Sequence, residues 1–273
     1  MDKEYTEDLN WNGKYTDIEY PEFAQLKQND DSIWLTIPTF RSGTGKDFQK
    51  ALNMLQENSN PSYVVFDLRG NGGGSTEYAF PLIEAVYGTG YLKSLGNSIS
   101  LNQKSIFSYK ATQGNLEFYK STLKVNKTLK SAMEPIINGM EKALKSGKKL
   151  YTIIDNPFYN YKGMKGMSKP YPPVFFVTDT SIGSSSWQFV RVLKALSGTY
   201  QIGDRTDTEQ HPTEMARYPI GKNYVLYNPS AWIIAPSGYL GKAFMPEIPF
   251  TKGLYNTNKL KKHIKYYYGL IKD

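Results

Sequence analysis

The sequence of 273 residues has no cysteine, only two histidines and no run of 18 apolar residues. The lack of cysteine excludes disulfides, thiolate metal sites and a cysteine nucleophile. The lack of a long apolar run predicts no transmembrane helix, and the first residues, MDKEY, do not resemble a signal peptide. We also expect no metal and no organic cofactor.

Basic residues outnumber acidic ones, 33 to 25, for a formal net charge of +8. Such a balance can indicate an anionic partner such as nucleic acid or a wall polymer. The lysines are scattered, however, with clusters only in residues 145–149 and 259–265. We therefore expect no nucleic-acid partner. The length and the 40% of hydrophobic residues allow one large domain with a sizeable core.

The stretch 63–75, with the sequence YVVFDLRGNGGGS, organises the rest of the chain. It predicts a short apolar strand that runs into a glycine-rich turn, followed by a helix from Ser75 or Thr76. Consecutive glycines leave backbone amides accessible and allow positive φ. Amides just before a helix can bind an anion or an oxyanion. The alternative is a tight strand-to-helix turn with no chemistry.

Residues 67–74 resemble the D-L-R-x-N-x-G-G signature of the C-terminal processing (tail-specific) serine peptidases, a family related to the catalytic domain of tricorn protease. Further matches follow in order and cover roughly residues 30–252. They are the strand 173–178, the serines 184–186 where the family has S-A-[SA]-E, the turn 202–206 and the segment 245–249. The resemblance implies an α/β fold of the crotonase-like (ClpP/crotonase) type, a spiral of ββα units with a helical insertion.

Apolar patterns predict the regular elements of this region. Strands are expected over 32–38, 62–67, 173–178 and 200–203. Helices are expected over 47–58, 76–87, from 184 or 185 to 196, and over 256–272. A strand, a helix and a strand in sequence predict a βαβ unit with parallel strands.

The domain boundaries follow from these elements. We expect an N-terminal arm over 1–30, a peptidase-like domain over 31–255 with an insertion at about 91–170, and a basic C-terminal helix over 256–273. Within the insertion, 91–121 suggests short strands or a wrapping segment, and 122–145 one long helix or two short ones with a possible break at Pro135. This helix forms either a lid or a solvent-exposed surface.

The remaining segments have weaker patterns. Residues 146–170 and 204–221 are predicted to be loops. Residues 224–227 and 231–235 are predicted to pair as a hairpin around 228–230.

The predicted nucleophile lies at the strand-to-helix turn 180–186. A serine hydroxyl needs positioning and a base before it attacks a carbonyl, and such a turn exposes it at the carboxyl end of a parallel sheet. Counting back from Phe189 and Leu193 assigns the nucleophile to Ser184; a shift by one residue would assign it to Ser185. The alternative is that these serines merely cap the helix.

The resemblance also implies the other parts of the site. The oxyanion hole would use the amides of Gly74 and Ser185. The family's catalytic lysine position holds Glu209, so His211 is the best candidate for the base, with Glu209 as a possible orienting carboxylate. The alternatives are a histidine with no role, or a base among the lysines of 146–170. Trp187 replaces the family's glutamate.

These observations favour a serine-type peptidase that hydrolyses peptide bonds through an acyl-enzyme on Ser184, with a peptide or protein as substrate. The alternative is a catalytically inactive relative that binds extended peptides or a cell-surface polymer; a third reading is a basic adhesion or scaffold protein. We expect an extracytoplasmic protein whose signal is missing from this sequence, with a cytoplasmic location as the alternative. The sequence does not indicate the oligomeric state.

Overall fold

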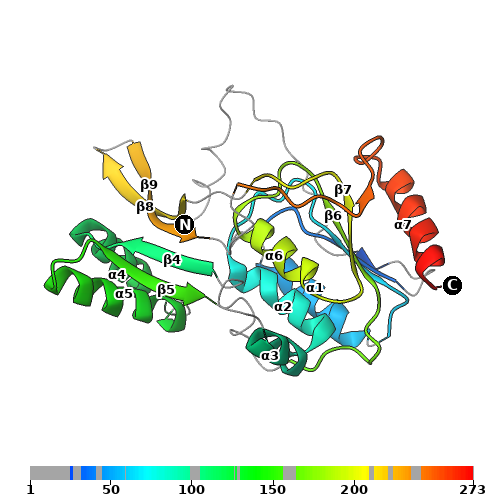
Figure 1. Cartoon of the computed structure of the whole chain (residues 1–273), viewed down its shortest axis with the longest axis horizontal. Helices are drawn as coiled ribbons and strands as arrows, with labels where there is room; N and C mark the ends of the chain where they lie inside the picture. Colours follow the sequence, from blue (N-terminus) through cyan, green and yellow to red (C-terminus); the bar gives the residue numbers. More distant parts are fainter. Residues whose placement is uncertain are drawn as a thin grey trace.

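The computed structural model describes residues 25–26, 32–40, 45–58, 60–98, 105–125, 127, 130–155, 164–208, 212–220, 224–234 and 241–272. Two lobes are visible (Figure 1). The large lobe contains a six-stranded sheet with strand order β1-β2-β3-β6-β7-β10, and the small lobe contains a four-stranded sheet with order β5-β4-β9-β8. Within the described ranges, no helix is long and apolar enough to cross a membrane.

The large sheet is parallel except at one edge. Its strands are β1 (Gln25–Leu26), β2 (Ile33–Thr36), β3 (Val64–Asp67), β6 (Val174–Thr178), β7 (Thr199–Gly203) and β10 (Ile248–Pro249). Only β1 runs antiparallel to its neighbour β2. The central strands pair in parallel register, with Val64 opposite both Ile33 and Val174. The four strands predicted from the apolar runs are thereby confirmed.

Alternate residues of the central strands enter two separate cores. On one face, Val64 and Phe66 pack with residues of α1 (Gly45–Glu57), α2 (Thr76–Tyr87) and α6 (Ser184–Lys194). On the other face, Val65 packs with α7 (Thr257–Lys272). Because both faces are covered, the strands are apolar throughout, as buried parallel strands require. The helices predicted at these places are confirmed, with small shifts at their ends.

The small lobe is built from two separate parts of the chain. One part supplies β4 (Ser105–Lys110), α4 (Gln113–Val125), α5 (Lys130–Lys145) and β5 (Leu150–Asp155), and the other supplies β8 (Pro212–Ile220) and β9 (Tyr224–Ile234). All neighbouring strands are antiparallel. Side chains of α4 and α5, among them Tyr119 and Met140, form a third core with Tyr109 of β4. The lobe therefore exceeds the predicted insertion at 91–170 and is not purely helical.

The predictions for this part of the chain are confirmed only in part. Residues 91–121 contain α3 (Thr89–Ser98) and the start of α4 as well as the strand β4. The buried residues of α4 are Asn115, Leu116 and Tyr119, which is helical spacing that the polar residues between them obscured. Two helices occupy 113–145, but Pro135 lies inside α5 and does not break it.

The predicted loops and hairpin are also corrected. Residues 146–170 contain β5, and 204–221 contain β8. The prolines of β8 resembled a loop, but β8 is an edge strand that pairs only with β9, and edges tolerate proline. Asn228 and Pro229 lie within one continuous strand, opposite Ala216 and Met215. The hairpin is therefore formed by β8 with β9 and not within 224–235.

Candidate active site

Two loops meet at the carboxyl edge of the large sheet. One follows β3 and carries the glycine run 70–74; the other follows β6 and leads into α6. Since β3 and β6 are adjacent parallel strands with Asp67 opposite Val177, both loops leave the sheet side by side. Ligand sites of open α/β sheets lie at this edge.

Ser184, the predicted nucleophile, is the first residue of α6 and is exposed. Its φ is +51°, in the left-handed region that a residue with a side chain seldom adopts. Gly183 before it is extended, with φ −144° and ψ 175°. A sharp strand-to-helix turn with a strained serine is the arrangement known as a nucleophile elbow. Such strain typically costs about 1–3 kcal/mol and accumulates at functional sites.

Ser185, the alternative nucleophile, is in a different environment. Only 4% of its surface is exposed. Its Oγ is buried and has no hydrogen-bond partner among the described residues. Of the two serines, Ser184 therefore presents its side chain to solvent and Ser185 does not.

The glycine run packs directly against the turn that carries Ser184. A Cβ placed on Gly73 would lie 2.7 Å from the Ser184 Cβ and 3.1 Å from the Ser185 amide nitrogen. Gly73 has φ +111° and Gly74 has φ +143°. The Gly73 amide donates to the Asn71 Oδ1 at 2.9 Å, whereas the described residues offer no acceptor to the amides of Gly74 and Ser185. The loops that carry the two predicted oxyanion donors are thus packed against each other.

Asn71 fixes the distance between the two loops. Its side chain is fully buried and accepts a hydrogen bond from the Ser186 Oγ at 2.5 Å, besides the one from Gly73. Its Nδ2 donates to the Ile37 carbonyl at 2.8 Å. One amide side chain therefore joins β2, the glycine run and α6. The sequence pattern does not indicate this role, although Asn71 is part of the D-L-R-x-N-x-G-G signature.

Two carboxylates, those of Asp67 and Asp179, accept hydrogen bonds at the start of the two loops. Asp67 is 1% exposed and pairs with Arg69, whose Nε and Nη2 donate to its oxygens at 2.7 and 2.5 Å. Arg69 Nη1 also donates to the Leu254 carbonyl at 2.6 Å, just before α7. Asp179 accepts from the amides of Gly70 and Ser181, both at 2.9 Å. These contacts shape the backbone of the loops and involve neither Ser184 nor Ser185.

The predicted base is not among the described residues. Glu209 and His211 both lie outside them. The preceding residues are described: the Asp207 amide donates to the Ile182 carbonyl at 3.1 Å, next to the turn of Ser184. The second histidine, His263, lies on α7 and stacks on Phe250 with ring centroids 4.3 Å apart.

Trp187, at the family's glutamate position, is 2% exposed and packs on Phe244, with ring centroids 4.7 Å apart. It therefore belongs to the core and places no charge near Ser184. Within the described ranges, no three His, Cys, Asp or Glu side chains gather where they could share a metal ion.

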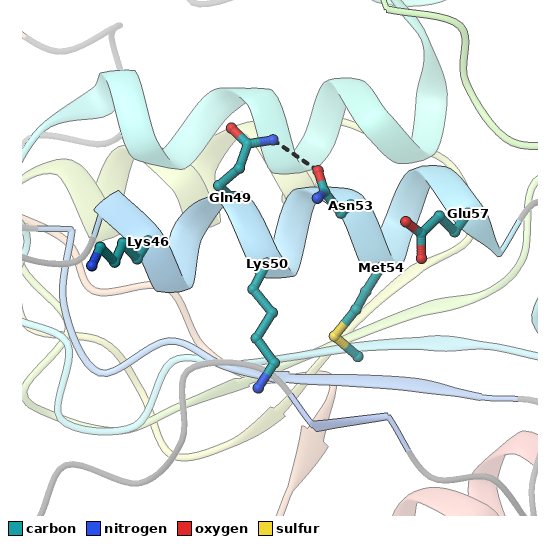
Figure 2. Close-up of a pocket in the computed structure, with 6 residues that line it drawn as sticks. All are labelled: Lys46, Gln49, Lys50, Asn53, Met54 and Glu57. Atoms are coloured by element: carbon teal, nitrogen blue, oxygen red, sulfur yellow. Dashed lines mark hydrogen bonds between the residues drawn. The ribbon is translucent and has the colours of Figure 1, made fainter.

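A shallow hollow on the outer side of α1 is shown in Figure 2. It is lined by Lys46, Gln49, Lys50, Asn53, Met54 and Glu57. These side chains include no hydroxyl, thiol or imidazole, so the hollow differs in kind from the turn at Ser184.

An exposed serine at a strained turn beside accessible backbone amides is an arrangement that serine hydrolases use. The chain belongs to Peptidase family S41, whose profile matches residues 33–243. The family predicted from the motifs is therefore confirmed. No curated protein is significantly similar to the chain in sequence.

Two solved structures of CPAF share the fold at low sequence identity. Mature CPAF superposes with a TM-score of 0.56 at 14% identity, and its complex with lactacystin with 0.54 at 15% identity. Each match covers 87% of this chain and 52% of the CPAF chain, so this chain spans about half the length of that relative. The photosystem II D1 C-terminal processing protease matches with a TM-score of 0.42 at 14% identity, covering 81% of this chain and 42% of that one.

Proposed function

We propose that this protein is a serine peptidase whose nucleophile is Ser184. The observation that carries the proposal is the exposed serine with φ +51° at the start of α6, packed on the glycine run. A buried neighbour, Ser185, does not compete for this role. We further propose that residues 31–255 form the catalytic domain, with the crotonase-like spiral typical of the family.

In the proposed reaction the Ser184 Oγ attacks the carbonyl carbon of the scissile peptide bond and transfers its proton to a base. The carbonyl oxygen becomes negatively charged and is bound by the amides of Gly74 and Ser185. The base then protonates the leaving amine, and an ester on Ser184 remains. Water, deprotonated by the same base, hydrolyses that ester. Loss of one oxyanion donor typically lowers kcat by about 100- to 1000-fold.

His211 is the proposed base, and Glu209 the proposed carboxylate that orients it. The support is the position of the preceding chain: Asp207 is hydrogen-bonded beside the turn of Ser184. Because a residue spans at most about 3.6 Å of chain, His211 lies within about 14 Å of Asp207. An imidazole titrates near neutral pH, so it can accept the serine proton.

The proposed substrate is a peptide or protein, and the proposed location is extracytoplasmic. The substrate class derives from the family, and the location is the one expected from the sequence.

The decisive experiment is labelling with a fluorophosphonate probe. We expect the wild type to be labelled once and Ser184→Ala not at all, with similar thermal unfolding of the two proteins. Ser181→Ala is the matched control, because Ser181 is an exposed serine of the same loop. Labelling of Ser184→Ala but not of Ser185→Ala would transfer the nucleophile to Ser185. No labelling of the wild type between about pH 5 and 10, which spans the histidine and lysine titrations, would instead favour an inactive protein that binds peptides or a surface polymer.

A further inference from the structure

The C-terminal helix α7 holds most of the excess positive charge of the protein. Its 16 residues include five lysines and no acidic residue. The formal net charge of this helix is therefore +5, compared with +8 for the whole chain. Such concentration on one surface element indicates attraction to a negatively charged partner.

Lys261 packs over the Trp34 ring at 5.2 Å, whereas other lysines of α7 face away from the protein because the inner side of the helix is used for packing. Leu260 and Ile264 are fully buried against the sheet. Lys259, Lys262 and Lys265 are exposed, and their spacing of three residues places them on one outer face. This face, with the residues described next, is the outer face of α7.

Apolar side chains lie among the lysines on the same face. Tyr266 is 62% exposed and Leu270 is 55% exposed. Tyr266 is four residues after Lys262, and Leu270 is four residues after Tyr266, so both lie on the side of the helix between Lys259 and Lys262. Large apolar groups gain free energy on leaving water, so a partner for this face must accept both charge and apolar contact.

We propose that the outer face of α7 is a docking surface for a membrane that contains anionic phospholipid. Lysine ammonium groups are attracted to lipid phosphates, with about 1 kcal/mol for each lysine near the surface. Tyrosine and leucine enter the boundary between head groups and acyl chains, as in helices that lie in a membrane interface. A nucleic acid or a wall polymer would satisfy the lysines but would leave the aliphatic Leu270 in water.

The position of α7 allows the candidate site at Ser184 to stay accessible when α7 is docked on a membrane. α7 covers the face of the sheet opposite to α1, α2 and α6, and it lies at the end of the molecule opposite the small lobe (Figure 1). Ser184 is on α6, away from the proposed contact. The inference does not depend on peptidase activity, and its test uses binding alone.

The test is co-sedimentation of the full chain with large unilamellar vesicles. We expect binding to vesicles of phosphatidylcholine with about one third phosphatidylglycerol, no binding to pure phosphatidylcholine, and release in about 1 M salt, where screening shortens the reach of charge to about 3 Å. The triple variant Lys259→Glu, Lys262→Glu, Lys265→Glu should bind at least roughly 100-fold more weakly.

A matched control changes the same charge elsewhere. Lys142, Lys145 and Lys148 are exposed lysines at the end of α5, and their replacement by glutamate should leave vesicle binding largely intact. Equal loss in both triple variants would mean that net charge, and not α7, drives binding, and would overturn the proposal.

The apolar contribution separates lipid from a purely anionic partner. The double variant Tyr266→Ser, Leu270→Ser should bind vesicles roughly tenfold more weakly at unchanged charge. The assignment would be overturned if this variant bound vesicles as tightly as the wild type does. It would also be overturned if the wild-type protein did not bind the anionic vesicles, or if it bound a DNA oligonucleotide tightly without binding vesicles. Circular dichroism melts verify that every variant is folded.

Discussion

Substitution of single glycines in the signature provides a test of the packing between the glycine run and the turn of Ser184. Gly70 and Gly73 both have positive φ, +78° and +111°. They differ in their surroundings: nothing lies within 4 Å of a Cβ on Gly70, whereas a Cβ on Gly73 would lie 2.7 Å from the Ser184 Cβ and 3.0 Å from the Gly183 carbonyl. Alanine at Gly70 therefore tests backbone strain alone, whereas alanine at Gly73 tests backbone strain together with a steric clash.

The expected magnitudes follow from these contacts. Alanine at Gly70 should cost about 1–2 kcal/mol for the left-handed conformation, offset by about 0.4–1 kcal/mol from the restricted unfolded chain. The net loss is about 1 kcal/mol. Alanine at Gly73 adds overpacking, typically about 1–3 kcal/mol, and its φ lies further from the left-handed minimum. We expect a loss of about 3 kcal/mol.

The two glycine variants should differ even more in their reactivity with the probe than in their stability. To admit the new methyl group, the start of α6 must move away from the glycine run, which separates the amides of Gly74 and Ser185. Gly73→Ala should therefore lose fluorophosphonate labelling by at least about 100-fold, the usual effect of one oxyanion donor, while Gly70→Ala is labelled at nearly the wild-type rate. Urea unfolding measures stability, and the labelling time course measures reactivity. If Gly73→Ala matches Gly70→Ala in both assays, the contact described here does not control the site.

Three further predictions concern buried polar groups. Asn71→Ala should lower the free energy of unfolding by about 1–3 kcal/mol, because the Gly73 amide and the Ser186 hydroxyl lose their acceptor. It should also slow labelling. Ser186→Ala alone should have a smaller effect on both urea unfolding and labelling. Arg69→Ala should destabilise by about 3 kcal/mol because Asp67 would be left as a buried unpaired carboxylate; unfolding that equals the wild type would contradict the structural role. Burial lowers the pKa of His263 below its ordinary value. As the pH falls, the unfolded state therefore takes up the proton first, and stability should fall as the pH drops below about 6.5. His263→Phe should reduce this dependence of stability on pH in melts between pH 5 and 8; an unchanged dependence would assign it to other groups.

The sequence predicted the large lobe well and the small lobe poorly, for a physical reason. The strands of the large sheet are buried on both faces, so Val64, Val65 and Phe66 form a continuous apolar run that is easily recognised. In the small lobe, β9 carries exposed Tyr224, Val225 and Leu226 beside Asn228 and Pro229. Its long pairing with β8 is a tertiary effect that local propensity does not contain.

The candidate site was predicted through its motif, and its supports were not. The register that selected Ser184 over Ser185 agrees with the exposure of the first and the burial of the second. The positive φ of Ser184 and the link from Asn71 to Ser186 are not local features of the sequence. They require the two loops to be folded against each other, over more than a hundred residues of chain. His211 and Glu209 stay predictions.

The construction of the small lobe from two distant parts of the chain has a consequence for folding during synthesis. β4 pairs with β9 so that Ile106 lies opposite Ile234, and contacts between such distant residues form slowly. Until β9 has been synthesised, one edge of β4 has no partner strand, and an open strand edge promotes association with other chains. We therefore expect nascent chains that end before β8 to be the species most dependent on chaperones, and pulse-labelling hydrogen exchange should show the amides of β4 protected later than those of β3.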